Sequence, residues 1–332
     1  MSERASSPLG GTEAGTVSAV ADPRDLTGTG LTEAWVAELV ERTLAEDLTG
    51  GAPLPGAPDL AVAHDVTSAA TVPATQLGTA DLVARADGVV AGLPVAARVF
   101  TRLAPGATLT AEAADGDRVV RGDVLLTVRG PVRALLAAER SALNIASRAS
   151  GIATATRAWV DAVDGTGAVV LDTRKTTPGL RPLDKYAVRC GGGSNKRMGL
   201  YDVAMVKDNH VAAAGSVSKA FELVRAAAPE LPVEVEVDTV AQCEEAIGAG
   251  AELILLDNMN LAELRSCVAL AAATGGRVKL EASGGLSLQI AAAVAGTGVD
   301  YLAVGSLTHS APVLDIGLDL TYLGATHAGA DG

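Results

Sequence analysis

Residues Leu171–His210 read LDTRKTTPGLRPLDKYAVRCGGGSNKRMGLYDVAMVKDNH and contain two short apolar segments, each followed directly by charged residues. Basic side chains crowd into this stretch, although the chain of 332 residues has a formal net charge of −13. They include Arg174, Lys175, Arg181, Lys185, Lys196, Arg197 and Lys207. The guanidinium fork suits carboxylates and phosphates, and Lys acts as a point charge on phosphate. The stretch therefore predicts a binding site for a small polyanion.

The rhythm of an apolar strand followed by a helix continues through the C-terminal half of the chain. We predict strands over 168–175, 203–210, 233–239, 253–259, 277–285 and 301–306. Strands that are apolar almost throughout and alternate with helices indicate a parallel sheet covered by helices. Six units are too few for a complete eight-stranded barrel. The pattern leaves an incomplete barrel and an open sheet as alternatives.

The N-terminal half has a different pattern. Residues 31–47 have helical spacing of apolar side chains, and 49–63 are rich in Gly, Pro and Ala, as loops are. Short β segments with turns are predicted over 66–130. Residues 132–163 predict a long helical region that is either continuous or broken near Gly151.

One β segment, DGDRVVRGDVLLTVRG, resembles the fold of lipoyl and biotinyl carrier domains. Such carriers need a modifiable Lys at the tip of a hairpin. The sequence has no Lys before Lys175. We therefore interpret this segment as purely structural.

The overall composition excludes several classes of protein. The acidic balance argues against nucleic acid and anionic membranes as partners, and no run of about 18 apolar residues predicts a membrane span. Residues 1–28 are small and polar without an apolar leader segment, and we expect a disordered tail. Cys190, Cys243 and Cys267 are odd in number and widely spaced, which fits a reducing cytoplasm. The four histidines are scattered, so a metal site built from His is not expected.

Polar or glycine residues follow every predicted strand of the C-terminal half. The active site of a βα barrel lies at the C-terminal ends of its strands. Those ends carry Asp172, Arg174 and Lys175; Lys207 and Asp208; Glu236 and Asp238; Asp257; Glu281 and Ser283; and Gly305 and Ser306. One such charge would be expected in a solvated loop, whereas the whole set predicts a shared site.

Different parts of this set suggest different roles. The segments Ser283–Gly285 and Val304–Ser306 end the last two strands, where barrels commonly bind phosphate through backbone N–H groups. Glu236 and Asp257 could hold Mg²⁺ through water, bond ribose hydroxyls or stabilise a developing cation. The alternative for either carboxylate is an ion pair with a neighbouring Lys or Arg. The set suits a phosphorylated, Mg²⁺-bound sugar and a second anionic substrate.

Taken together, the motifs closely resemble those of the quinolinate phosphoribosyltransferase (carboxylating nicotinate-nucleotide pyrophosphorylase, or diphosphorylase) family over roughly residues 31–325. The resemblance rests on AEDL, DVTS, ERSALNIASRASGIAT, LDTRKTTPGLRPLDKYAV, CGGGSNKRMGLYDVAMVKDNH, VEVEVDT, LLDNM, EASGGL and VGSLTHSAPVLDIGLDL. It implies an α/β fold with an N-terminal open-faced sandwich over 29–145 and an incomplete six-stranded barrel over 146–309. The C-terminal segment 310–326 would return to the first domain.

The resemblance also implies the reaction. Quinolinate and 5-phosphoribosyl-1-pyrophosphate would give nicotinate mononucleotide, pyrophosphate and CO₂ in de novo NAD biosynthesis, with Mg²⁺ as cofactor. The protein would be a cytoplasmic homodimer in which Arg140 crosses to the partner's site. Without the resemblance, Arg140 would be interpreted as an exposed helix charge.

Residue roles follow from the resemblance by matching motifs. The quinolinate carboxylates would be bound by Arg140, Arg174, Lys175, Lys196 and Arg197, with Thr173 in the same turn. Lys175 and Lys207 would contact pyrophosphate, and Glu236 and Asp257 would face the ribose and Mg²⁺. The 5′-phosphate would be held by Ser283, Gly284, Gly285, Val304, Gly305 and Ser306. Lys175, Glu236 and Asp257 are the predicted catalytic residues.

The chain departs from the family pattern at two places. Asn195-Lys196-Arg197 stands where the family usually has Asn-His-Arg, so a permanent cation replaces a titratable one. The loop 49–63 is longer than usual and is interpreted as a surface insertion. Two other functions remain: a paralogous, molybdenum-associated pyrophosphorylase with another acceptor, and a non-catalytic nucleotide-binding protein. The second would be expected to lose Glu236, Asp257 or the cations of the TRK turn, and all are present.

Overall fold

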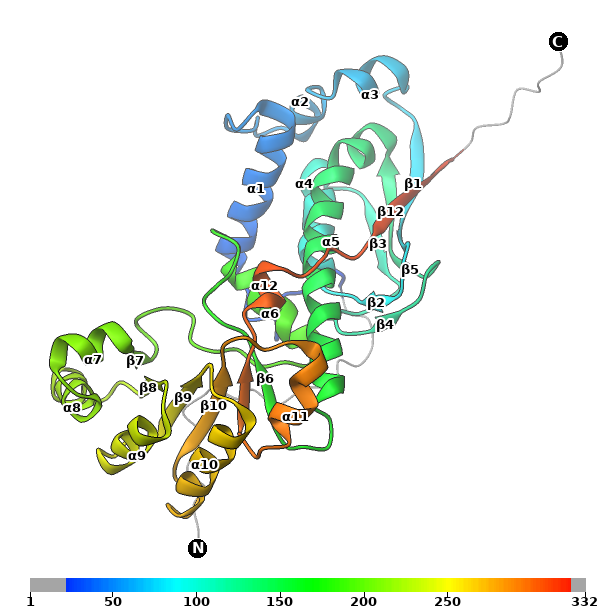
Figure 1. Cartoon of the computed structure of the whole chain (residues 1–332). Coiled ribbons are helices and arrows are strands. Elements are labelled where there is room, and N and C mark those ends of the chain that lie inside the picture. The colour runs from blue at the N-terminus through cyan, green and yellow to red at the C-terminus, as the bar shows by residue number, and fades with distance from the viewer. Residues whose placement is uncertain (1–21, 324–332) are drawn as a thin grey trace, which may run out of the picture. The chain divides into compact units, whose positions relative to one another are not determined.

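The computed structural model describes residues 22–323, which form two compact units (Figure 1). Residues 155–181 and 191–311 make up the barrel unit, and residues 22–154, 182–190 and 312–323 make up the sandwich unit. The units divide at Thr154/Ala155 and Ala311/Pro312. From the sequence we placed the domain boundaries at 145/146 and 309/310. These positions stay predictions, because a division into compact units does not test where independent domains begin and end.

The barrel unit is built on a parallel sheet in the order β6-β11-β10-β9-β8-β7. Its strands are β6 (Val169–Leu171), β7 (Ala204–Val206), β8 (Val233–Val237), β9 (Leu253–Asp257), β10 (Lys279–Ser283) and β11 (Tyr301–Ala303). These match the six strands predicted from the sequence. Side chains such as Ile254 and Leu256 are fully buried, as expected of strands covered on both faces. The predicted α/β fold is confirmed.

The curvature of this sheet follows from one contact. Ser194 forms a parallel bridge with Leu171, the last residue of β6. Only two residues later in the chain, the side chain of Lys196 contacts Glu234 on β8. In a flat sheet β6 and β8 would be four strand spacings apart, roughly 19 Å, far beyond the length of a lysine side chain. The sheet must therefore curl, and the unit is an incomplete barrel rather than an open sheet.

Helices follow the strands of the barrel unit. They are α7 (Asp208–Ala214), α8 (Val217–Ala227), α9 (Val240–Gly248), α10 (Leu261–Ala272), the 3₁₀ turn η1 (Leu288–Ile290), α11 (Ala291–Ala295) and α12 (Ser306–His309). Polar N-caps start the longer ones, because a side-chain oxygen satisfies the first free N–H groups. Ser216, Thr239 and Asn260 have this role, and the last two form capping boxes.

The sandwich unit contains an antiparallel sheet in the order β12-β1-β5-β3. Its elements are α1 (Glu33–Thr49), α2 (Pro58–Val62), α3 (Val66–Thr71), β1 (Leu77–Ala84), β2 (Gly88–Val89), α4 (Leu93–Leu103), β3 (Thr108–Ala111), β4 (Arg118–Val119), β5 (Val124–Pro131), α6 (Arg181–Cys190, whose first residue belongs to the barrel unit) and β12 (Ile316–Tyr322). The C-terminal strand β12 pairs with β1, so the chain end returns to this unit. Phe100, Leu82 and Leu126 are fully buried in its core.

Two local predictions for the sandwich unit are wrong, and the structure decides the alternative left open at Gly151. Helix α4 lies within 66–130, where only β segments were expected; Gly92, with φ +87°, and the following Leu-Pro start it. The predicted loop 49–63 contains α2. Helix α5 (Val132–Ala162), which runs from the sandwich unit into the barrel unit, is continuous past Gly151. That glycine is needed for packing, because a Cβ there would overlap the carbonyl oxygen of Pro312.

The predicted disordered tail covered residues 1–28, and 1–21 lie outside the described residues. Residues 22–28 are in contact with the sandwich unit, contrary to that prediction. Leu26 is buried, and Arg98 donates hydrogen bonds to the carbonyl of Arg24, so this short polar segment gains contacts that its composition does not reveal. Of the helices within residues 22–323, none is both long and apolar enough to cross a membrane.

Candidate active site

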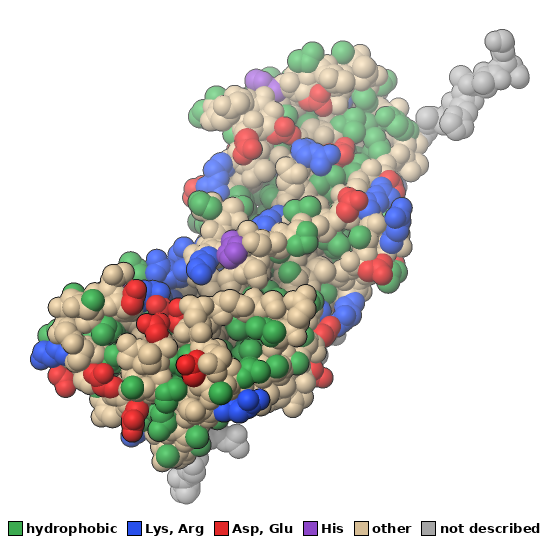
Figure 2. Space-filling model, viewed as in Figure 1, with side chains coloured by type: hydrophobic (Ala, Val, Ile, Leu, Met, Phe, Trp, Pro, Cys, Tyr) green, Lys and Arg blue, Asp and Glu red, His purple; other side chains and the backbone are tan. Residues whose placement is uncertain are grey.

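The C-terminal strand ends of the barrel unit carry nearly all the predicted site residues. Adjacent strands contribute Glu236 from β8, Asp257 from β9 and Ser283 from β10, and the register pairs Ser283 with Asp257. Figure 2 shows acidic and basic side chains next to one another on the face of this unit that carries α7, α8 and α9. Arg140 lies on α5 in the sandwich unit, where it is exposed to solvent.

The turn after β6 is held by hydrogen bonds to two other segments. Asp172 is fully buried and accepts bonds from the side-chain amide of Asn195 at 2.6 Å and from the backbone N–H of Lys196 at 2.8 Å. The hydroxyl of Thr308 donates to the carbonyl of Lys175 at 2.8 Å. The backbone is thereby fixed while the side chains of Arg174 and Lys175 are exposed. This turn can present two cations to an anion without reorganising.

Arg197 contributes a further cation close to Arg174. Its guanidinium donates to the carbonyl of Val203 at 2.6 Å and lies 3.6 Å from the sulfur of Met205. Burial, followed by the positive charge of Arg174, lowers the pKa of Arg197. Two guanidinium groups that repel each other are stabilised by a dianion placed near both. The pair is therefore suited to binding a dicarboxylate.

Glu236 and Asp257 are neighbouring carboxylates on β8 and β9. Glu236 accepts an ion pair from Lys207 at 2.7 Å, so the ion-pair alternative considered from the sequence is present for this residue. Burial, then the charges of Glu236 and Asp238, raise the pKa of Asp257. A cation placed between Glu236 and Asp257 would relieve that repulsion. The two oxygen donors fit Mg²⁺, which typically takes one or two carboxylates with waters and substrate phosphates.

Two glycine turns end β10 and β11. Gly284 and Gly285 have φ values of +82° and +59°, which favour glycine. A Cβ on Gly305 would lie 3.2 Å from both the Lys175 side chain and the His309 ring. These two side chains therefore pack closely against the backbone at Gly305. The following helices have at most five residues, so backbone N–H groups must bind a phosphate without a long helix dipole.

Val304 differs from the rest of the predicted phosphate set. Its N–H donates to the carbonyl of Leu171 at 2.9 Å, which is part of the strand pairing. That N–H group is not available to a phosphate in this conformation. The backbone contacts expected of the last turn fall to Gly305 and Ser306.

The sequence matches two family models that together cover most of the described chain. Residues 65–150 match the N-terminal domain and residues 152–319 the C-terminal domain of quinolinate phosphoribosyl transferase. The chain belongs to the quinolinate phosphoribosyltransferase family. This confirms the resemblance inferred from the motifs.

Known members of the family are similar over nearly their whole lengths. The "Nicotinate-nucleotide pyrophosphorylase [carboxylating]" of Mycobacterium leprae is 54% identical over 264 residues, which cover 79% of this chain and 93% of that protein. The crystal structure of NadC from Streptococcus pyogenes has a TM-score of 0.81 at 41% identity, covering 88% of this chain and 99% of that one. Nicotinate-nucleotide pyrophosphorylase from Ehrlichia chaffeensis has a TM-score of 0.79 at 33% identity, covering 88% and 100%.

Lys196 has an environment that was not expected from the sequence. Its side chain is 8% exposed, and its ammonium lies 2.8 Å from Glu234 Oε1 and also pairs with Glu281. Burial alone would lower the pKa of Lys196, but the charges of Glu281 and Glu234 raise it overall. The sequence predicted that this ammonium would bind quinolinate, whereas the structure directs it to two carboxylates of the barrel interior.

Glu234 and Glu281 are both 1% exposed. From the sequence, Glu281 was placed in the shared strand-end set without a role of its own, whereas the structure buries it inside the barrel, and Glu234 was not singled out. Burial and the charge of Glu234 raise the pKa of Glu281 to about 8, although Lys196 opposes this. A sequence signal existed for Glu234, because residues two apart in a strand face the same side. Glu234 therefore shares the inner face of β8 with Glu236.

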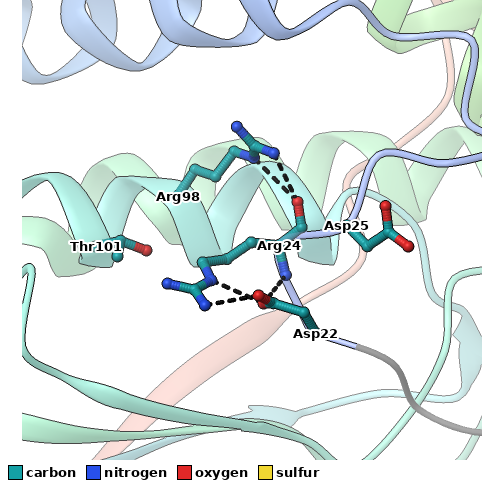
Figure 3. A pocket seen from close by; sticks show the side chains of 5 residues that line it. All are labelled: Asp22, Arg24, Asp25, Arg98 and Thr101. Carbon is teal, nitrogen blue, oxygen red and sulfur yellow. Dashed lines mark hydrogen bonds and ion pairs between the residues drawn. The ribbon is translucent and has the colours of Figure 1, made fainter.

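A hollow in the sandwich unit was not predicted from the sequence. Its volume is about 410 Å³, and Asp22, Arg24, Asp25, Arg98 and Thr101 line it (Figure 3). Arg24 donates to Asp22, and Arg98 donates to the carbonyl of Arg24. Because these groups are hydrogen-bonded to one another, we interpret the hollow as a gap in the packing of residues 22–25 against α4.

Proposed function

We propose that this protein transfers the phosphoribosyl group of 5-phosphoribosyl-1-pyrophosphate to quinolinate and releases pyrophosphate and CO₂. The product is nicotinate mononucleotide, an intermediate of de novo NAD biosynthesis. The observation that carries this proposal is the strand-end constellation in a chain of this family: Arg174 close to Arg197, beside Lys207, Glu236 and Asp257. Relatives named as carboxylating pyrophosphorylases support the same reaction.

Binding comes first, because two polyanions must be brought together. Arg174, Lys175 and Arg197 bind the two carboxylates of quinolinate, and Arg140 joins them from a second subunit. Lys175 and Lys207 neutralise the pyrophosphate. Ser283, Gly284, Gly285, Gly305 and Ser306 hold the 5′-phosphate, with Thr173 supporting the first turn through its bond to the N–H of Lys175. These basic side chains reduce the repulsion between the two anionic substrates. They do so whichever substrate binds first.

The chemistry then follows in two steps. The bond from ribose C1 to pyrophosphate breaks while the pyridine nitrogen forms a bond to C1, and Glu236 and Asp257 stabilise the positive charge that develops on the ribose. The N-ribosylated ring is cationic and accepts the electron pair released when the 2-carboxylate leaves as CO₂. A proton then replaces it at C2.

Mg²⁺ is the proposed cofactor. Glu236 and Asp257 would hold it, directly or through water, together with oxygens of the substrate. It would supply charge neutralisation for the departing pyrophosphate. The pairing of Lys207 with Glu236 at 2.7 Å gives the free protein a local counter-ion at the same position.

The proposed assembly is a cytoplasmic homodimer in which Arg140 completes the partner's site. Its exposure on α5 supports this, because an exposed guanidinium is available to a neighbouring subunit. The net charge of −13 is consistent with small anions, rather than nucleic acid, as partners in a site with locally gathered cations.

The experiment follows nicotinate mononucleotide and CO₂ from quinolinate, phosphoribosyl pyrophosphate and Mg²⁺, with nicotinate as a parallel acceptor. Equal amounts of both products from quinolinate, and none from nicotinate, are expected. Asp257→Asn should lose most activity, whereas Glu222→Gln on the exposed face of α8 should not. Product from another acceptor, with none from quinolinate, would overturn the proposal in favour of a paralogous pyrophosphorylase.

A further inference from the structure

Asn258 adopts a backbone conformation that is unusual for its residue type. Its φ is +55°, and within residues 22–323 it is the only non-glycine residue with positive φ. Asn tolerates this left-handed region better than most residues, but the conformation is still uncommon and concentrates at functional sites. Asn258 directly follows Asp257 at the end of β9.

The side chain of Asn258 is bonded to the neighbouring carboxylate. Its amide nitrogen donates to Asp257 Oδ2 at 2.8 Å. This bond lowers the pKa of Asp257, against the larger upward effects of burial and the charges of Glu236 and Asp238. The donor thus fixes the orientation of a carboxylate that its acidic neighbours would otherwise repel.

The backbone of Asn258 connects the same position to the next strand. Its N–H donates to the carbonyl of Ser283 at 2.9 Å. A Cβ on Gly284 would overlap the Asn258 side-chain oxygen and lie 2.8 Å from its backbone nitrogen. A residue larger than glycine would therefore not fit at position 284, because Asn258 occupies the space where its side chain would lie. The end of β9 and the turn after β10 fit each other at this one residue.

We propose that Asn258 is a positioning residue for the phosphoribosyl half of the reaction. Its amide orients Asp257 toward the ribose, and its left-handed backbone holds the Ser283–Gly285 turn against β9. The ribose-facing carboxylate and the phosphate-binding turn then keep a fixed separation. This inference rests on the proposed function for the identity of the ligand, and on the contacts of Asn258 for the role.

A simpler interpretation is that Asn258 serves only the turn. The two interpretations differ for Asn258→Gly, because glycine keeps the left-handed conformation and removes the amide. A turn residue would be replaced without loss. A positioning residue would weaken binding of phosphoribosyl pyrophosphate, since a hydrogen bond to a charged group is lost.

The test measures Mg²⁺-dependent binding of phosphoribosyl pyrophosphate by calorimetry, and kcat/KM for each substrate. For Asn258→Gly we expect the Kd to rise and kcat/KM for phosphoribosyl pyrophosphate to fall by about 10- to 100-fold, with the KM for quinolinate changed less than about 3-fold. Asn258→Asp, which also tolerates this backbone but places a second carboxylate beside Asp257, should bind less tightly still. Asn260→Gly, two residues along at the N-cap of α10, is the matched control with unchanged binding.

Wild-type affinity in both Asn258 variants would overturn the proposal. If Asn258→Gly does not fold, the Asn258→Asp variant decides the outcome by the same criterion. Binding is measured independently of the acceptor. If wild-type protein binds phosphoribosyl pyrophosphate but makes no product from quinolinate, the proposed function fails while the role of Asn258 is still tested. If wild-type protein does not bind phosphoribosyl pyrophosphate, both fail.

Discussion

The ammonium of Lys196 lies 2.8 Å from Glu234 Oε1 inside the barrel, and the same ammonium pairs with Glu281. Strands β8 and β10 of the barrel unit are thereby connected through one side chain from the segment that follows α6. Charges of this kind are stable in an interior only while they are paired, because each has lost its hydration.

Lys196→Met should destabilise the protein by about 3–5 kcal/mol, because it leaves Glu234 and Glu281 buried without their cation. The double variant Lys196→Met/Glu281→Gln should recover part of the loss, since it removes one of the two acidic groups. Denaturant unfolding measures both effects. Unchanged stability together with a raised KM for quinolinate would instead support the substrate-binding role that the sequence suggested for Lys196.

The raised pKa of Glu281 predicts how stability depends on pH. Its pKa is about 8 in the folded protein against an ordinary value of 4.5, so the folded state holds a proton that the unfolded chain releases at lower pH. The resulting stabilisation is fully present below about 4.5 and is lost as pH rises through about 8. We expect Tm to fall over this window. The Glu281→Gln variant cannot titrate at this position, so its Tm should fall less steeply with pH. Identical slopes of Tm against pH for the variant and the wild type would contradict the prediction.

Gly151→Ala should destabilise the sandwich unit. The added methyl group would overlap the carbonyl oxygen of Pro312 and lie 2.8 Å from Cα of Val313, which are backbone atoms and cannot move aside alone. Overpacking of this kind costs about 1–3 kcal/mol. Gly248→Ala on α9 is the control, because no atom lies within 4 Å of its Cβ position and a helical Ala is favoured by about 0.5–1 kcal/mol. Equal midpoints of urea unfolding for the two variants would argue against the packing role.

The residues at the strand ends could be predicted, because the pattern of the local sequence shows where each strand ends. Each apolar strand is followed by polar residues, and parallel strands bring these ends to one edge, so Glu236, Asp257 and Ser283 meet as expected. The contacts of Lys196 were not predictable, because they join Glu234 and Glu281, which are 38 and 85 residues away. The sequence resemblance suggested a substrate role for this position, whereas burial gives it interior partners.

A contact with a distant segment also decides between the two alternatives that the sequence left open at Gly151. Gly151 was interpreted as a possible helix break, since glycine disfavours helices. The structure shows that close approach of residues 312–313 requires it and that α5 continues. Propensity describes the local chain only, and here the contact with a distant segment determines the residue.

Arg140→Ala provides the sharpest test of the proposed assembly. Because Arg140 is exposed on α5, its removal should leave the free energy of unfolding within about 0.5 kcal/mol of wild type. If it binds quinolinate across a dimer interface, turnover should fall by about 100-fold or more, since a charge-assisted contact to the substrate is lost. Mixing Arg140→Ala with Asp257→Asn, each inactive alone, should restore up to about a quarter of wild-type activity, because half of the subunits form mixed dimers and each mixed dimer has one intact site. Sedimentation confirms that the variants still form dimers. Full activity of Arg140→Ala, or no restoration in mixed dimers, would remove Arg140 from the partner's site.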